Sequence, residues 1–137
     1  MSTPSPTNLI LIFLGSGIGG VLRWALGSAI LHHTINWKFP RATFTVNLAG
    51  CLAAGVVAGL IIKQDMFSSN MRLFLLTGLL GGFTTFSAFG VECMYLIRRG
   101  EWTVMALYVL LSVAIGIGGL VLALQFVPGQ PPQAHQP

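Results

Sequence analysis

The sequence predicts an all-α membrane protein with four transmembrane helices, and three observations support this fold class. Hydrophobic residues make up 54% of the 137 residues and charged residues only 7%, against about 25% charged residues in a soluble domain. The apolar residues form four long runs, each near the roughly 20 residues that a helix needs to cross a bilayer. The runs lack the two-residue alternation of a half-buried strand. We therefore expect a multi-pass protein of the cell membrane, embedded in the lipid bilayer.

The expected elements follow one another in a single domain. Residues 1–7 contain two prolines, two serines and two threonines and are expected to form a disordered lead. The four-span domain covers residues 8–127, with spans expected at about 8–31, 43–63, 71–97 and 102–127. Residues 128–137 are rich in proline and glutamine, a composition typical of a disordered tail.

The loops have a weak charge asymmetry. Short connections make neighbouring helices antiparallel, so the first and third loops share one side of the membrane and the termini share the other. Four bases lie on the loop side and two on the terminal side, where Asp65 offsets one of them; they are Lys38, Arg41, Arg98 and Arg99 against Lys63 and Arg72. This excess is too small to fix the orientation, so the chain can insert both ways. Four thin helices also enclose little interior, so a polar pathway would form between subunits and we expect a dimer.

The stretch 77–92 in the third span combines residues that are unusual in a membrane helix. It contains the pair Gly81-Gly82, the pair Thr84-Thr85, a serine, three phenylalanines and a carboxylate. Glycine and β-branched threonine weaken a helix interior, so we expect the third helix to be broken mid-membrane. Non-helical backbone at that depth is tolerated only where protein or a polar cavity covers its N–H and C=O groups. Free carbonyls there can coordinate a hard cation such as sodium, and nearby N–H groups favour an anion.

Two phenylalanines follow the expected break. Phe86 and Phe89 are three residues apart and therefore lie on one face of a helix. Aromatic rings are negative on the face and positive at the edge, so ring edges turned inward would stabilise a small anion. Core packing is the alternative for such a pair, and the neighbouring glycines and threonines weigh against it.

Polar side chains in the first two spans are further candidates. Arg23 lies well inside a span, where a charge costs on the order of 3 kcal/mol and usually faces a bundle interior or an aqueous cavity. It either attracts anions in a vestibule or snorkels to an interface. The amide of Asn47 offers two donors that can replace part of an anion's hydration shell, and Thr43 lies one turn earlier on the same face. A helix–helix hydrogen bond is the alternative for Asn47.

Hydroxyls in the fourth span and an acid in the third leave alternatives open. Tyr108 and Ser112 are four residues apart on one face, which Gly116 continues. They form either a hydroxyl track or interhelical hydrogen bonds. Glu92, one turn beyond Phe89, either pairs with a base at a helix end or lies beside an anion route, where it would repel the ion. The roles of Glu92 and Gly116 stay open.

Other patterns are set aside. Residues 15–20 match GxGxxG, but a dinucleotide site needs an acid about 20 residues further on, and the first acid is Asp65. We therefore interpret these glycines as helix packing. The bases form no cluster, which argues against nucleic-acid binding. Cys51 and Cys93 lack metal-ligand spacing, and without a nucleophile–base pattern or paired carboxylates we expect no enzyme.

Three motifs together resemble the Fluc (CrcB-type) fluoride channels. They are Gly-Gly-Phe-Thr-Thr-Phe-Ser-Ala-Phe at 81–89, Thr-Val-Asn-Leu-Ala-Gly at 45–50 and Gly-Gly-Val-Leu-Arg-Trp at 19–24. Their order and spacing agree with that family, and the four-span layout covers nearly the whole chain apart from its ends. The resemblance implies a dual-topology antiparallel homodimer with two fluoride pores and a buried structural sodium ion. It also implies passive, selective fluoride export that limits fluoride toxicity in the cytoplasm.

The resemblance implies roles for single residues as well. The backbone carbonyls of Gly81 and Thr84 would hold the sodium ion. The fluoride pathway would be lined by the aromatic pair, the amide, the arginine and hydroxyls, namely Phe86, Phe89, Asn47, Thr43, Arg23, Tyr108 and Ser112. The sequence departs from the family pattern at Ala88, where threonine is usual, at Ala42, where glycine is frequent, and at Gly116, where a hydroxyl is common. The last departure leaves the outer end of the hydroxyl track open.

Two other functions are alternatives. A small four-span, dual-topology multidrug exchanger needs a membrane carboxylate to exchange protons for cations, and resemblance to that family would put it in the first span. That span contains Arg23 and no acid. A non-transporting assembly subunit would leave the polar residues gathered at mid-membrane unexplained.

Overall fold

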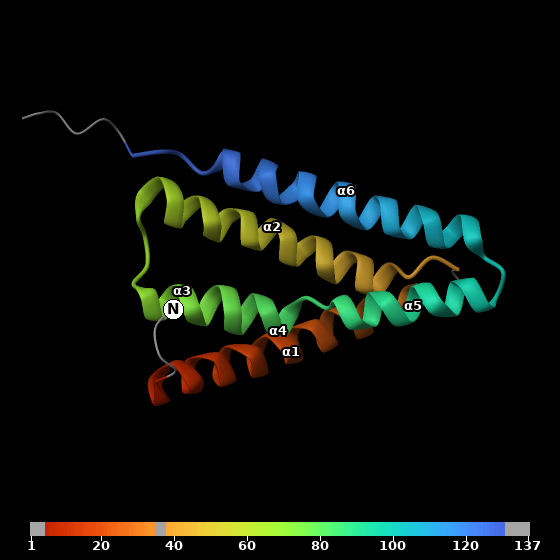
Figure 1. Ribbon diagram of the computed structural model, residues 1–137, viewed down its shortest axis with the longest axis horizontal. Helices are drawn as coiled ribbons and strands as arrows, with labels where there is room; N and C mark the ends of the chain where they lie inside the picture. Colours follow the sequence, from red (N-terminus) through yellow and green to blue (C-terminus); the bar gives the residue numbers. More distant parts are fainter. Residues whose placement is uncertain (1–4, 35–37, 131–137) are drawn as a thin grey trace, which may run out of the picture.

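Helical segments make up the described part of the chain (Figure 1). The computed structural model describes residues 5–34 and 38–130, and no strand occurs among them. Four segments are long and apolar enough to cross a membrane: Pro6–His32, Arg41–Gln64, Ser69–Arg98 and Trp102–Phe126. The predicted all-α architecture with four spans is therefore confirmed. The predicted disordered lead and tail fall largely outside the described residues, at 1–4 and 131–137.

The third crossing has more parts than the other three. The first, second and fourth crossings are single helices, namely α1 (Pro6–Thr34), α2 (Arg41–Gln64) and α6 (Trp102–Phe126). The third consists of α3 (Ser69–Arg72), the π-helix η1 (Leu73–Leu80), α4 (Gly81–Phe83) and α5 (Phe86–Arg98). A short non-helical link joins α4 to α5 (Figure 1). The π-helix is a finding that no sequence pattern predicted, and such segments are frequent at functional sites.

Helix α1 starts earlier than predicted, and its first residues explain why. The Ser5 hydroxyl accepts a hydrogen bond from the backbone N–H of Asn8 at 3.2 Å, which is the arrangement of a helix N-cap. Pro6 takes the first helical position, where its missing N–H costs nothing and its fixed φ suits a helix. The helix therefore begins at Pro6, within the stretch 1–7.

Glycines set the distance between the first and third crossings. Gly15 and Gly19 are buried where α1 packs against η1 and α4. A Cβ on Gly15 would lie 2.9 Å from the Cα of Gly78, and one on Gly19 would lie 2.7 Å from the backbone nitrogen of Phe83. Helices in lipid approach this closely only through small residues. The interpretation of the glycines at 15–20 as packing residues is therefore confirmed for Gly15 and Gly19 but not for Gly17 and Gly20, where an added Cβ would have nothing within 4 Å.

Substitution of Gly19 by alanine is expected to push α1 away from α4, because the new Cβ would meet backbone atoms, which cannot rotate aside. Overpacking of this kind costs about 1–3 kcal/mol. Gly20 is the matched control, since a Cβ there has nothing within 4 Å. In thermal unfolding of the detergent-solubilised protein, Gly19→Ala should lower the melting temperature and Gly20→Ala should not. Equal melting temperatures would contradict the close packing at Gly19.

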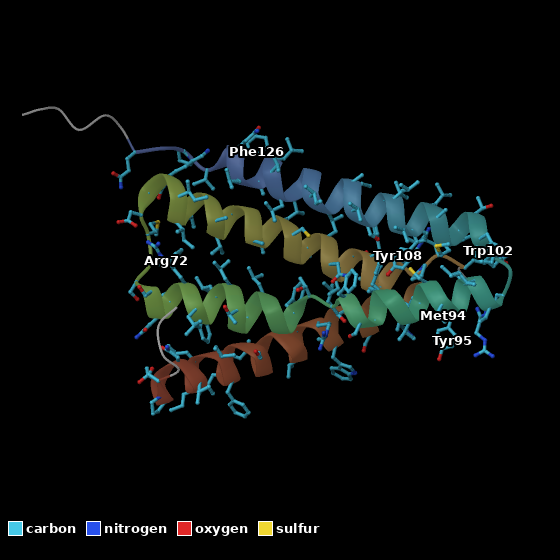
Figure 2. All side chains as sticks on the ribbon, in the orientation of Figure 1. Arg72, Met94, Tyr95, Trp102, Tyr108 and Phe126 are labelled. Carbon is cyan, nitrogen blue, oxygen red and sulfur yellow. The ribbon has the colours of Figure 1, made fainter. Side chains whose placement is uncertain are left out.

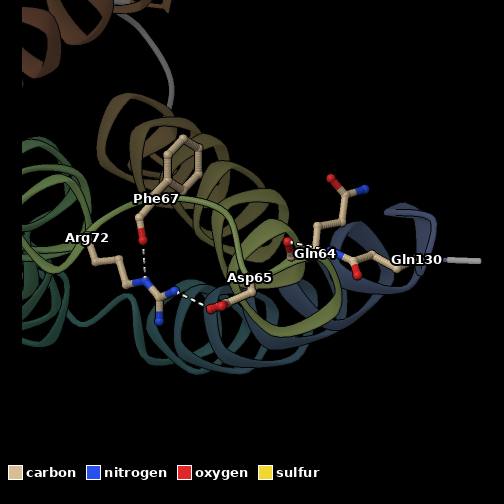
Figure 3. A network of polar contacts seen from close by, with 5 residues as sticks. All are labelled: Gln64, Asp65, Phe67, Arg72 and Gln130. Carbon is tan, nitrogen blue, oxygen red and sulfur yellow. Dashed lines mark hydrogen bonds and ion pairs between the residues drawn. The ribbon is translucent and has the colours of Figure 1, made fainter. Parts of the chain in front are cut away.

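Polar contacts tie the turn after α2 to its neighbours (Figure 3). Asp65 and Phe67 have φ values of 48° and 75°, a left-handed conformation that side chains disfavour. Arg72 holds this turn, with Nε donating to the carbonyl of Phe67 at 2.9 Å and Nη2 lying 2.7 Å from Oδ1 of Asp65. The Gln130 side chain donates to the carbonyl of Gln64 at 2.9 Å. The segment after α6 is thereby attached to the end of α2.

Candidate ion site

The helical backbone is interrupted between α4 and α5. Thr84 and Thr85 are both extended, with φ and ψ of −80° and 160° for Thr84 and of −149° and 121° for Thr85. The Thr84 hydroxyl donates to the carbonyl of Leu80 at 2.9 Å, and the Thr85 hydroxyl caps α5 by accepting from the N–H of Ala88 at 3.2 Å. The Thr85 side chain therefore caps the start of α5, whereas the Thr84 hydroxyl is a second donor to the carbonyl of Leu80, which also accepts from the N–H of Thr84 at 3.0 Å.

Asn47 of α2 pairs with the interrupted backbone through both ends of its amide. Its Nδ2 donates to the carbonyl of Thr85 at 2.9 Å, and its Oδ1 accepts from the N–H of Thr85 at 2.8 Å. Asn47 thus satisfies two groups that a continuous helix would have satisfied itself. The helix–helix hydrogen bond weighed for Asn47 is present. The same side chain also lines a cavity of about 230 Å³ with Thr84, Thr85 and Phe86.

Arg23 of α1 points at the same break. Its Nη1 donates to the carbonyl of Thr84 at 3.2 Å, and the residue is half-buried. Arg23 also lines a cavity of about 430 Å³ bounded by α1, α2 and α5, whose wall includes Thr43, Thr85 and Glu92. The guanidinium therefore combines a positive charge with a contact to the interrupted backbone, on the wall of the largest of the described cavities.

Glu92 accepts hydrogen bonds from hydroxyls of two other helices. The Thr43 hydroxyl donates to its Oε1 at 2.6 Å, and the Tyr108 hydroxyl donates to its Oε2 at 2.7 Å. Among the described residues the ion pairs join Lys38 to Glu101 and Arg72 to Asp65, and neither includes Glu92. The structure thus brings Thr43 and Tyr108, two candidates from separate spans, to one carboxylate. The spacing of the hydroxyls within each helix did not predict that Thr43 and Tyr108 would bond the same carboxylate.

Aromatic rings continue from the break toward the end of the bundle. The centroids of Phe86 and Phe89 are 5.6 Å apart with an interplanar angle of 34°, and Phe89 lies 4.9 Å from Tyr108. Tyr108 is fully buried and projects from α6 toward α5 (Figure 2). Phe39, which sequence reasoning did not single out, packs edge-on against Tyr108 at 5.3 Å. Phe86 differs from all of these because 84% of its surface is exposed in the single chain.

The fourth span places its two candidate hydroxyls in different surroundings. Tyr108 bonds Glu92, whereas the Ser112 hydroxyl is buried and has no hydrogen-bond partner within residues 5–34 and 38–130. Gly116, one turn further on, is buried against α2, where an added Cβ would lie 3.4 Å from Sγ of Cys51. The structure therefore does not link Ser112 to the cluster at Glu92.

The oxygens here that suit a hard cation are backbone carbonyls. The N–H of Thr85 would close a helical bond to the carbonyl of Gly81 but bonds Asn47 instead, and the extended Thr84 turns its carbonyl out of the helical direction. Hard cations such as sodium prefer oxygen ligands of this kind. Arg23 already donates to the carbonyl of Thr84, whose second lone pair stays available. The residues present therefore fit a cation bound by carbonyls.

Comparison with known proteins identifies the family. The family model described as "CrcB-like protein, Camphor Resistance (CrcB)" matches residues 10–124. The chain belongs to the CrcB family. It is 43% identical over 119 residues to the "Fluoride-specific ion channel FluC" of Methylobacillus flagellatus, covering 87% of this chain and 93% of that protein. Proteins with the same name from Beijerinckia indica and Flavobacterium psychrophilum are 43% and 40% identical, with 84% of this chain covered in each case and 91% and 95% of the relatives.

The match to the CrcB family covers the whole candidate site. Residues 10–124 include every side chain that contacts the break and the carboxylate, together with all four spans in large part. This CrcB-family chain is a multi-pass membrane protein, and its named relatives are ion channels and not enzymes.

Proposed function

We propose that the chain is a fluoride-selective ion channel. The observation that carries the proposal is the match to relatives named fluoride-specific channels over 87% and 84% of the chain, together with the family match over residues 10–124, which include the whole candidate site. The geometry agrees with anion passage, because an arginine, an asparagine amide and a pair of rings lie around one interrupted backbone segment. Such groups stabilise an anion through N–H donors and positive ring edges.

In this proposal the third helix is broken mid-membrane, and the residues around the break line the fluoride pathway. Arg23 gathers fluoride in the larger cavity, and Asn47, Phe86 and Phe89 stabilise it near Thr84 and Thr85. Thr43, Tyr108 and Ser112 line the rest of the route; the Ser112 hydroxyl has its proton available for an anion, whereas Thr43 and Tyr108 would have to release Glu92 before donating to fluoride. Because flow is passive, the channel would export fluoride that has entered a cell as HF and ionised in the cytoplasm.

We further propose a structural sodium ion held by the carbonyls of Gly81 and Thr84. The support is the release of both carbonyls from the helical pattern and the exposure of Gly81 in the single chain. One chain supplies two such oxygens, so a second copy would supply four. When bound, the ion would neutralise these carbonyl dipoles at a depth where water cannot.

An antiparallel, dual-topology homodimer with two pores is the assembly we propose. The support is the exposure of Gly81 in the single chain, because its carbonyl is freed from the helical pattern and lipid alone would not satisfy it. The near-balance of loop charges permits both orientations. Chemical crosslinking would test for the dimer, and labelling of a cysteine placed at one terminus would test whether both faces of a vesicle expose it.

Fluoride efflux from liposomes containing the purified protein tests the function, with chloride as the control ion. We expect fluoride to leave far faster than chloride. Equal flux of the two ions, or no flux of either, would overturn the proposal. A second arm replaces all sodium with N-methylglucamine; fluoride flux should then fall, and unchanged flux after exhaustive dialysis would contradict the sodium site alone.

A small multidrug exchanger is not favoured. That mechanism needs a carboxylate free to exchange protons for cations, whereas both oxygens of Glu92 accept short hydrogen bonds. The relatives named above are channels.

A further inference from the structure

A third cavity lies at the end of the bundle where α5 finishes and α2 begins. It has a volume of about 240 Å³ and is lined by Lys38, Pro40, Glu92, Tyr95, Leu96 and Arg99. Each water occupies about 30 Å³ in the liquid, so this space suits a small anion with its first hydration shell. Glu92 also lines the larger cavity that contains Arg23. One carboxylate therefore stands between the two cavities.

The charged residues around this third cavity differ in whether they have a partner. Glu92 already accepts from two hydroxyls. Arg99 is exposed and makes no ion pair among residues 5–34 and 38–130. The Nζ of Lys38 lies 2.6 Å from the Oε1 of Glu101, and the lysine side chain is 70% exposed. The lining therefore carries two cations, Lys38 and Arg99, and one carboxylate, Glu92; Lys38 is also paired with Glu101 outside the lining, and Arg99 has no ion-pair partner among the described residues.

We propose that this third cavity is a mouth that concentrates small inorganic anions by means of Lys38 and Arg99. Glu101 weakens the attraction of the mouth for anions, because its carboxylate offsets part of the positive charge of Lys38. Two cations against one carboxylate leave the lining with a net positive charge, and a cleft with an excess of one sign of charge raises the local concentration of the opposite ion and its rate of entry. The inference rests on the proposed function, since it assigns this mouth to the route that fluoride takes.

Arg98 provides a matched control for Arg99. Both arginines are exposed at the C-terminal end of α5, where any cation is favoured by the helix dipole. Only Arg99 lines the cavity. If neutralising Arg99 changes the flux more than neutralising Arg98 does, the effect comes from the cavity. If both changes have the same effect, it comes from the overall charge at this end of the protein.

The first experiment measures fluoride efflux from liposomes at subsaturating fluoride and low ionic strength. We expect Arg99→Gln and Lys38→Gln to lower the flux about two- to threefold and Glu101→Gln to raise it about twofold, with Arg98→Gln near wild type. The differences should vanish at about 0.3 M of an impermeant salt, because the Debye length falls from about 30 Å at 0.01 M to below 8 Å. Equal flux in Arg98→Gln and Arg99→Gln, or effects that persist in high salt, would overturn the mouth while leaving the channel function intact.

A second experiment tests the mouth without measuring ion flux. Tyr95 lines the cavity and is 59% exposed, so Tyr95→Cys, with Cys51 and Cys93 replaced by alanine, places a single thiol there. The reaction rates of anionic and cationic methanethiosulfonates at this thiol are compared at low ionic strength. We expect added Arg99→Gln to lower the anionic-to-cationic rate ratio several-fold and added Arg98→Gln to change it little. Equal ratios in the two variants would overturn the mouth even if the protein conducts no fluoride.

Discussion

Replacement of Asn47 by leucine is expected to abolish most of the fluoride flux and to destabilise the fold. Leucine has a similar volume but cannot pair with Thr85, whose N–H and C=O now lie 2.8 Å and 2.9 Å from the amide. A fully buried backbone group left without a partner costs about 1–3 kcal/mol; Thr85 is half-buried, so we expect about 1.5 kcal/mol for each of its two groups. With two groups affected, we expect a loss of about 3 kcal/mol in unfolding free energy and at least a tenfold loss of flux.

Cys51 offers the control for this substitution. It follows Asn47 by one helical turn and lines the same cavity, yet no hydrogen bond joins it to the break among the described residues. Cys51→Ala should therefore retain most of the flux and the melting temperature of wild type. Liposome flux and thermal unfolding in detergent measure the two effects. Wild-type stability in Asn47→Leu would contradict a supporting role for the amide, and wild-type flux would contradict a role in conduction.

The helices were predictable because membrane spans depend on long-range averages of composition. A run of apolar residues near 20 must be helical in lipid, whatever its neighbours are. The helix breakers Gly81, Gly82, Thr84 and Thr85 likewise act locally, through backbone propensity. Extended dihedrals occur at the two threonines, and the glycines remain in the short helix α4. The π-helix η1 was not predictable, since its apolar residues suit either kind of helix.

The contacts of the site were less predictable than its members. Polarity in an apolar run was enough to single out Asn47, Thr43 and Tyr108. Their partners depend on how three helices are set in register, as the bond from Thr43 to Glu92 spans 49 positions of the chain. Phe39 gave no signal at all, because an aromatic residue at the edge of a span is common. Its place against Tyr108 appears only once α2 and α6 are packed together.

Replacement of Phe86 by isoleucine is expected to reduce fluoride flux at least tenfold while leaving the folded chain as stable as wild type. The ring is 84% exposed in the single chain, so its loss removes little packing within that chain. Isoleucine remains apolar and bulky but lacks the positive ring edge that would stabilise an anion. Phe86→Ile should therefore lower the fluoride flux without lowering the stability, whereas Asn47→Leu should lower both.

Phe126 is the matched control, as an equally exposed phenylalanine at 85% on α6 and far along the chain from the break (Figure 2). Phe126→Ile should keep wild-type flux, and crosslinking should detect the same dimer in both variants. Phe89→Ile should also lose flux but with some loss of stability, because its ring packs 4.9 Å from that of Tyr108. If Phe86→Ile conducts fluoride as well as Phe126→Ile does, ring edges do not stabilise the ion. If it loses the dimer along with the flux, the ring serves assembly instead.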